Sequence, residues 1–339
     1  GIVNQNITYA DKNDTIFLIS NGANQARNTN YDWTTTVPGN TEKTLWTKFL
    51  PEDSMPQVLN PKSGYVFNAN QTCLEMTAPE ENPKRENLSK AILFDTLENN
   101  RSRRFYENIS KYDKVSWDDF LKIKYDSKHP EHVVFIRNFK IDDLYDLKPE
   151  NYPDISDAIR TIQQWNKKGE IADTNAAFTY ELMYEMYDKS AGDMEAKFRT
   201  DVKAKTEMYI ATLRKVKADF LKNWGKVNIP LGDYQRHIRG NVDLPIDGGP
   251  DMWNAKYGNP YGKGKRKTWL GESFILLAQF TKDGVKFRTV SPYGTSNKAG
   301  SKHYTDQMNL YVNHETKEES LSKDWAYKHA ERIYKPGEE

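Results

Sequence analysis

The chain has 339 residues, and its 49 Lys and Arg side chains nearly balance its 48 Asp and Glu, which leaves a net charge of +1. This balance argues against a nucleic-acid-binding protein, which normally carries an excess of basic residues. No stretch approaches the roughly 20 apolar residues that a membrane helix needs, and 12% aromatic residues are too many for a disordered chain. We therefore expect a folded protein without a nucleic-acid partner or a membrane-spanning segment.

The first 70 residues combine strand-forming runs with turn formers. Two β-rich runs flank a cluster of Asp and Asn, and this pattern predicts a hairpin over residues 6–20. Frequent Gly, Pro, Asn and Asp predict long ordered loops over residues 21–64. The pattern of residues 64–70 predicts a strand, which would place Asn68 and Asn70 on the same face.

The middle of the chain has the spacing of helices. A basic run predicts a helix over residues 101–109, and Ser116 followed by acidic residues is a typical helix start. Residues 155–168 and 174–224 are also helical by pattern. In the latter segment, large apolar side chains recur at spacings of three and four, and we expect them to form one buried face. These side chains are Phe178, Leu182, Met183, Met186 and Tyr187.

The last third of the chain returns to strand and turn signals. Residues 240–262 are rich in Gly, Pro and Asp. Two β-rich runs within residues 273–290 predict strands that are joined by a hairpin turn at Asp283-Gly284. The charged residues 317–333 predict a helix.

This order of elements predicts an α/β protein with β-rich ends and a helical middle. The changes of pattern divide the chain into three segments, residues 1–110, 111–225 and 226–339.

The residue types that most often carry catalysis give little direction. A single cysteine, Cys73, excludes an intrachain disulfide and a cysteine zinc cage, and nothing around it resembles a nucleophile turn. We expect His129 and His132 on the surface, whereas His303 has two open roles, a base or a structural hydrogen-bonding group. The basic run at residues 263–267 lacks the spacing of a phosphate-binding loop and is typical of a solvated loop.

The most distinctive polar pair is Asn68 with Asn70. Burying an amide costs free energy unless it is hydrogen-bonded, so the pair is either a structural network or a set of donors aimed at a ligand. An asparagine amide is also a recognised donor to the oxyanion in acyl-transfer sites.

Several segments, in order along the chain, resemble the penicillin acylase family. Residues 60–70, NPKSGYVFNAN, look like the segment that carries the oxyanion-hole asparagine of that family, and residues 54–58 just before them fit it too. Residues 242–250, VDLPIDGGP, are similar to a stretch of acyl-homoserine lactone and aculeacin-type acylases. Residues 303–307, HYTDQ, followed by Leu310-Tyr311, match the family's C-terminal signature.

The resemblance implies an N-terminal nucleophile hydrolase with a four-layer αββα fold, matured by autocatalytic cleavage of a precursor. In that family the nucleophile is a serine at the start of the β-subunit, and its own α-amine is the base. Here residue 1 is Gly, and the family's Ser-Trp-Gly-type segment is absent. We therefore expect this chain to be the C-terminal part of such a β-subunit and to form one incomplete domain. Its expected partners are the upstream β-subunit segment and the α-subunit of the same precursor.

The resemblance also suggests roles for three residues. Asn70 aligns with the catalytic asparagine, whose amide would donate to the tetrahedral oxyanion. Asn68 is its near neighbour and a candidate substrate-binding residue. Arg104 matches the arginine that the family places beside the nucleophile and the asparagine, where a fixed positive charge would hold the asparagine and keep the α-amine neutral.

The implied reaction is hydrolysis of an N-acyl amide through an acyl-enzyme, with N-acyl homoserine lactones, lipopeptides or β-lactams as the substrate class. Residues 242–250 favour fatty-acyl substrates. No cofactor is required; family members often bind a structural calcium ion, but Glu80 and Glu81, which fall near one expected position, do not match its ligands convincingly. The resemblance further implies a bacterial protein of the periplasm or the medium.

An alternative of another class is a non-catalytic fragment or an inactive paralogue. Such a protein would only bind acylated ligands or its partner chain. A serine-initiated segment in the same precursor would distinguish the enzyme from this alternative.

Overall fold

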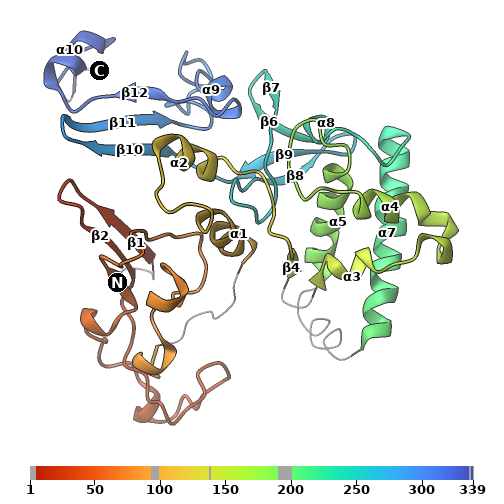
Figure 1. Ribbon diagram of the computed structural model, residues 1–339, viewed down its shortest axis with the longest axis horizontal. Coiled ribbons are helices and arrows are strands. Elements are labelled where there is room, and N and C mark those ends of the chain that lie inside the picture. The colour runs from red at the N-terminus through yellow and green to blue at the C-terminus, as the bar shows by residue number, and fades with distance from the viewer. Residues whose placement is uncertain (1–4, 93–98, 137–138, 190–200, 336, 339) are drawn as a thin grey trace. The chain divides into compact units, whose positions relative to one another are not determined.

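The computed structural model describes residues 5–92, 99–136, 139–189, 201–335 and 337–338 (Figure 1). The chain divides into two compact units, and we describe each by itself. Unit 1 contains Gly1–Asp143 and Asp251–Trp253, and unit 2 contains Leu144–Pro250 and Asn254–Glu339. This division does not coincide with the boundaries after residues 110 and 225 that the sequence pattern suggested.

Unit 1 is built from short elements joined by long loops. Its first sheet has the order β1-β2-β3 and is antiparallel throughout. The elements are β1 (Gln5–Ala10), β2 (Ile16–Asn21), β3 (Gln57–Leu59), α1 (Asn100–Ile109), α2 (Trp117–Lys124), β4 (Val134–Ile136) and β5 (Phe139–Lys140), followed by α3 (Asp142–Tyr145) at the border with unit 2. The loops also contain single-turn 3-10 helices at Glu42–Thr44, Glu52–Ser54, Pro79–Glu81 and Arg85–Asn87.

Local signals in the sequence correctly located the hairpin and the first two helices. In the hairpin turn, Asp11 Oδ1 accepts hydrogen bonds from the backbone N–H groups of Asn13 (2.8 Å) and Thr15 (3.1 Å). In α2, Ser116 and Asp119 form a reciprocal capping box. Each signal acts within a few residues, so it does not depend on the rest of the fold.

The predicted strand at residues 64–70 is wrong. These residues form no strand but an irregular segment that ends in a turn. Asn68 Oδ1 accepts the backbone N–H of Asn70 at 2.9 Å, and Asn70 has a φ of +58°. Asn readily forms such side-chain turns and tolerates the left-handed region, so turn chemistry overrides the strand pattern here.

An aromatic cluster packs the segment before this turn against α1. The Phe67 and Phe105 rings are stacked with centroids 4.1 Å apart, and Trp253 stacks on the other side of Phe105 at 5.1 Å. Ile123 of α2 completes the buried group. Aromatic pairs of this kind add about 0.5–1.5 kcal/mol each beyond their area burial, so residues 65–67 have a fixed position on α1.

Unit 2 combines a helical layer with two sheets (Figure 1). One sheet has the order β7-β6-β9-β8, with β6 and β9 parallel and the other pairs antiparallel, and the second is the antiparallel β10-β11-β12. The helices are α4 (Ser156–Gln163), α5 (Ala176–Lys189), α7 (Val202–Trp224), α8 (Leu231–Tyr234), α9 (Met308–Val312) and α10 (Lys323–His329), with 3-10 turns at Pro149–Asn151 and Pro153–Ile155. The strands are β6 (Gln235–Arg239), β7 (Val242–Pro245), β8 (Tyr257–Tyr261), β9 (Lys265–Leu270), β10 (Ile275–Thr281), β11 (Gly284–Val290) and β12 (Lys317–Glu319).

The helical predictions in unit 2 hold in part, since the helix expected over residues 155–168 ends at Gln163. Four of the five side chains expected on one face of α5 are buried, and the exception is Tyr187, which is 68% exposed. Residues 190–200 of the predicted long helix lie outside the described residues. Helix α7 begins at the Asp201 cap and ends at Gly225, whose φ of +73° is the usual left-handed helix stop.

The C-terminal predictions hold in part. The hairpin at residues 273–290 is confirmed, with Thr281 opposite Gly284. The expected helix over 317–333 is wrong at its start, because Lys317–Glu319 pairs with β11 as β12 and only Lys323–His329 is helical. None of the helices in the described ranges is long and apolar enough to cross a bilayer.

Gly249, in the DGGP segment of residues 247–250, has no room for a side chain. A Cβ on Gly249 would lie 2.4 Å from Cζ of Tyr180, and Tyr180 is fully buried. We expect Gly249→Ala to lower the free energy of unfolding by about 1–3 kcal/mol, the usual cost of overpacking. Urea unfolding would measure this, with Gly300→Ala as the control because nothing lies within 4 Å of the Cβ built there. Equal stabilities of the two variants would contradict the steric account.

Candidate active site

The Asn70 turn is fixed from both sides by side-chain amides. Asn68 Oδ1 holds the backbone N–H of Asn70 and also accepts from Nδ2 of Asn6 at 3.0 Å. Gln71 accepts the backbone N–H of Ala69 and donates Nε2 to the carbonyl of Phe67 at 3.1 Å. The Asn70 side chain itself is exposed. The backbone is therefore held while the Asn70 carboxamide faces outward.

The first turn of α1 is built around this loop. Asn99 caps the helix by accepting the N–H of Ser102 at 2.8 Å, and its Nδ2 donates to the carbonyl of Ala69 at 2.8 Å. Asn100 is fully buried and exchanges hydrogen bonds with the backbone of Val134, through Nδ2 at 2.6 Å and Oδ1 at 2.8 Å. The hydrogen bond from Asn99 to Ala69 thus ties the start of α1 to the residue before Asn70.

Arg101, the next residue on this turn, reaches the Asn70 side chain. Arg101 Nη1 donates to Asn70 Oδ1 at 2.9 Å, and Arg101 Nε donates to Asp251 Oδ1 at 3.2 Å. Because the carboxamide oxygen is engaged by a cation, the Asn70 amide cannot turn over without losing a charge-assisted hydrogen bond. Its N–H₂ group is consequently directed away from Arg101.

Asp251 belongs to unit 1 although it lies 150 residues after Arg101. Its second oxygen accepts both the backbone N–H (3.1 Å) and Nδ2 (2.9 Å) of Asn100. Burial raises the pKa of Asp251, while the Arg101 charge and the Asn100 donors act in the opposite direction.

The structure places Arg104 in a different network from the one that we expected. Its hydrogen bonds in the described part of the chain go to both oxygens of Asp126 and to Glu107, and its side chain is 10% exposed. Burial lowers the pKa of Arg104, but hydrogen bonds to Asp126 and Glu107 outweigh this and raise it overall. The arginine that contacts Asn70 is Arg101, one turn earlier.

The histidines named by the sequence are structural. His129 is fully buried, not exposed as expected, and burial together with the Arg104 charge lowers its pKa to about 3. His303 lies between two carboxylates, with Nδ1 2.7 Å from Asp306 and Nε2 3.2 Å from Glu331, and hydrogen bonds to both raise its pKa. Both ring nitrogens already have a carboxylate partner, and both contacts favour the charged ring, which disfavours a role as a general base.

Glu81, near the expected calcium position, has both carboxylate oxygens engaged by the backbone. Glu81 uses both oxygens to accept the backbone N–H groups of Lys62 (2.6 Å) and Ser63 (2.8 Å). Across the described ranges no group of three His, Cys, Asp or Glu side chains could hold a metal ion. We therefore assign no chemistry to calcium.

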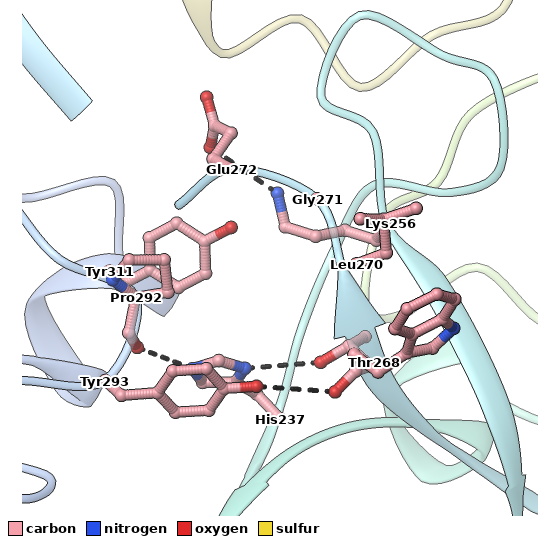
Figure 2. A pocket seen from close by; sticks show the side chains of 10 residues that line it. His237, Lys256, Thr268, Leu270, Gly271, Glu272, Pro292, Tyr293 and Tyr311 are labelled. Carbon is pink, nitrogen blue, oxygen red and sulfur yellow. Dashed lines mark hydrogen bonds and ion pairs between the residues drawn. The ribbon is translucent and has the colours of Figure 1, made fainter. Parts of the chain in front are cut away.

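A second polar cluster surrounds a small pocket in unit 2 (Figure 2). His237 donates Nε2–H to the carbonyl of Pro292 at 2.6 Å, its Nδ1 lies 3.2 Å from the Thr268 hydroxyl, and burial lowers its pKa to about 4. Lys256 Nζ lies 3.7 Å from Glu272. The cavity of about 30 Å³ has room for about two water molecules, which is too little for an acyl amide.

Comparisons with known proteins agree with the resemblance in the sequence. The family model described as penicillin amidase matches residues 1–326. A stretch of 84 residues is 32% identical to the acyl-homoserine lactone acylase PvdQ of Pseudomonas putida, which is 24% of this chain and only 10% of that protein.

Among solved structures, the thermostable penicillin G acylase from Alcaligenes faecalis is similar with a TM-score of 0.59 at 16% identity. The likeness covers 98% of this chain and 67% of that chain. It confirms the expected α/β class and the N-terminal nucleophile hydrolase fold.

The only cysteine can be tested as a nucleophile directly. Cys73 is buried, and burial raises the pKa of its thiol to about 11. We expect a thiol reagent at pH 8 to modify it only after denaturation, because both the thiolate and its access are missing in the folded state. Rapid labelling of the folded chain would contradict this placement.

Proposed function

Because the chain belongs to the penicillin amidase family, we propose that it is part of an enzyme that hydrolyses N-acyl amides through an acyl-enzyme intermediate. The observation that carries the proposal is the oriented Asn70 carboxamide. It is exposed, its backbone is fixed by Asn68, and its oxygen is held by Arg101. A neutral N–H donor in a fixed direction is what an oxyanion site needs.

Asn70 would act when the substrate carbonyl becomes tetrahedral. A nucleophile adds to the carbonyl carbon, the C=O π electrons move to oxygen, and Asn70 Nδ2–H donates to that oxyanion. The base that takes the nucleophile's proton passes it to the leaving amine as the C–N bond breaks, and the acyl group stays on the nucleophile. Water then adds to the acyl-enzyme as the base takes its proton, and the same donor stabilises the second oxyanion. The base returns that proton to the nucleophile as the carboxylic acid leaves.

Arg101 supports this role better than Arg104 does. The guanidinium on Asn70 Oδ1 polarises the amide and so strengthens its N–H as a donor. A positive charge beside the oxyanion donor would also favour the neutral form of a nearby α-amine, which could then serve as a base. Arg104 has its charge neutralised by Asp126 and Glu107 and joins elements of unit 1.

We propose that the nucleophile is a serine at the N-terminus of a segment outside these 339 residues, with its α-amine as the base. The likeness to the penicillin G acylase, of whose chain this one covers 67%, supports this arrangement. The complete enzyme would then be this chain together with that segment after processing.

We propose a fatty acylated amine as the substrate, such as an N-acyl homoserine lactone or a lipopeptide. The partial match to an acyl-homoserine lactone acylase supports this class over a β-lactam side-chain amide. Autocatalytic processing and a location in the periplasm or the medium are part of the same proposal.

The proposal is tested by Asn70→Ala in the complete enzyme. We expect kcat to fall about 10²- to 10³-fold, as it does when one oxyanion donor is removed, with KM little changed. Processing is first checked by gel, since the same donor would also serve self-cleavage. Asn13→Ala, a change of an exposed asparagine in the same unit, is the control. Unchanged turnover of processed Asn70→Ala would contradict the proposal.

The two arginines can be separated by comparing Arg101→Ala with Arg104→Ala. Arg101→Ala should lower kcat by about 10- to 100-fold, since misplaced catalytic groups typically cost about that much. Arg104→Ala removes the cation from the part-buried Asp126, which keeps the hydrogen bond from Asn108, and should instead lower stability by about 1–3 kcal/mol. Calorimetry and steady-state kinetics measure both. The reverse result would return the role to Arg104.

A further inference from the structure

We infer that Asp251 is a positioning residue that sets Arg101 in the orientation in which Arg101 holds Asn70. The inference rests on the proposed function. At the start of α1 a cation lies at the positive end of the helix dipole, and a carboxylate distant in the sequence offsets it.

Helix α1 begins without a negative charge of its own. Its first turn contains no acidic residue, yet Arg101 places a cation there. The positive end of the helix dipole disfavours a cation by about 0.3–1 kcal/mol. Asp251 supplies the missing anion, because its Oδ2 accepts the backbone N–H of Asn100 at 3.1 Å.

The two oxygens of Asp251 have separate partners. Oδ2 is fixed by the N–H and Nδ2 of Asn100, and Oδ1 accepts Arg101 Nε–H at 3.2 Å. Asn100 is itself locked to the backbone of Val134. With one oxygen anchored to the helix end, the other cannot follow Arg101 if its side chain swings. The carboxylate therefore selects one direction for the guanidinium.

The 251–253 segment has a second contact with α1 besides the Asp251 carboxylate. Asp251 has a φ of +49°, a conformation that is uncommon outside glycine and that Asp tolerates better than most residues. Trp253 stacks on Phe105 of α1, one turn beyond Arg101. The segment thus contacts α1 at two points.

The orientation matters because Arg101 uses a different nitrogen for each partner. With Nε directed to Asp251, Nη1 reaches Asn70 Oδ1 at 2.9 Å. Without the carboxylate, the guanidinium, whose side chain is 20% exposed, would be free to turn toward water. Asn70 would then lose the contact that fixes its amide, so Asp251 acts on the oxyanion donor through Arg101.

The test is Asp251→Asn in the complete enzyme, alone and combined with Arg101→Ala. We expect the single change to lower kcat by about 10- to 100-fold with little change in KM, because it misdirects a donor that acts on the oxyanion. In the Arg101→Ala background Asp251→Asn should cause no further loss of kcat, since Asp251 acts through the Arg101 side chain, which is absent there. Additive losses, or an unchanged kcat of Asp251→Asn, would overturn the inference.

Asp126→Asn is the matched control. Asp126 pairs with Arg104 on the same helix, and its side chain is 14% exposed, so the change removes a similar part-buried carboxylate. It should lower the melting temperature without changing kcat of the folded enzyme. A fall of kcat in both variants would show a general effect of loosening α1 and would also overturn the inference.

Two further measurements keep the result decisive. If Asp251→Asn does not fold, Asp251→Glu, which keeps the charge but moves it, replaces it in the same cycle with Arg101→Ala. Asn70→Ala is measured in parallel: if Asn70→Ala keeps full turnover, the proposed function fails and the inference fails with it. If Asn70→Ala loses turnover but the losses of Asp251→Asn and Arg101→Ala add, the proposed function stands and the positioning role of Asp251 is wrong.

Discussion

The hydrogen bond from Arg101 to Asn70 Oδ1 is the contact on which the account of this protein depends. A carboxamide can present either its oxygen or its N–H₂ group to a ligand, and only the latter stabilises an oxyanion. Because Arg101 donates to Asn70 Oδ1, the N–H₂ group is the one that can face a ligand. The hydrogen bond from Asn99 Nδ2 to the carbonyl of Ala69 fixes the distance between the start of α1 and the Asn70 turn. The candidate site is therefore a helix start fastened to a turn.

This arrangement explains why the turn and the helix contain so many asparagines. Each uses its amide in a different way: Asn68 holds the backbone N–H of Asn70, Asn99 caps α1, and Asn100 joins Asp251 to β4. The Asn70 side chain is exposed, and its oxygen accepts from Arg101. An asparagine at a positive φ combines a tolerated backbone strain with a polar side chain, which suits a donor at the tip of a rigid turn.

Much of this could be predicted from the sequence, but only where the signal is local. The 6–20 hairpin and the capped α2 follow from turn and cap residues within a few positions of each other. The 64–70 strand was wrong because the same asparagines that fit a strand face also form side-chain turns. The family resemblance points to Arg104, and no local pattern shows which of two arginines one turn apart meets Asp126. Asp251, 150 residues away, gives no sequence signal at all.

The most direct test is a crystal structure of the complete enzyme with an alkylboronic acid bound as a tetrahedral adduct. The account predicts that Asn70 Nδ2 lies about 2.7–3.1 Å from the boronate oxygen in the oxyanion position, while Arg101 still donates to Asn70 Oδ1. A boronate oxygen held by other donors, with the Asn70 amide turned away or Arg101 released from it, would contradict the central claim.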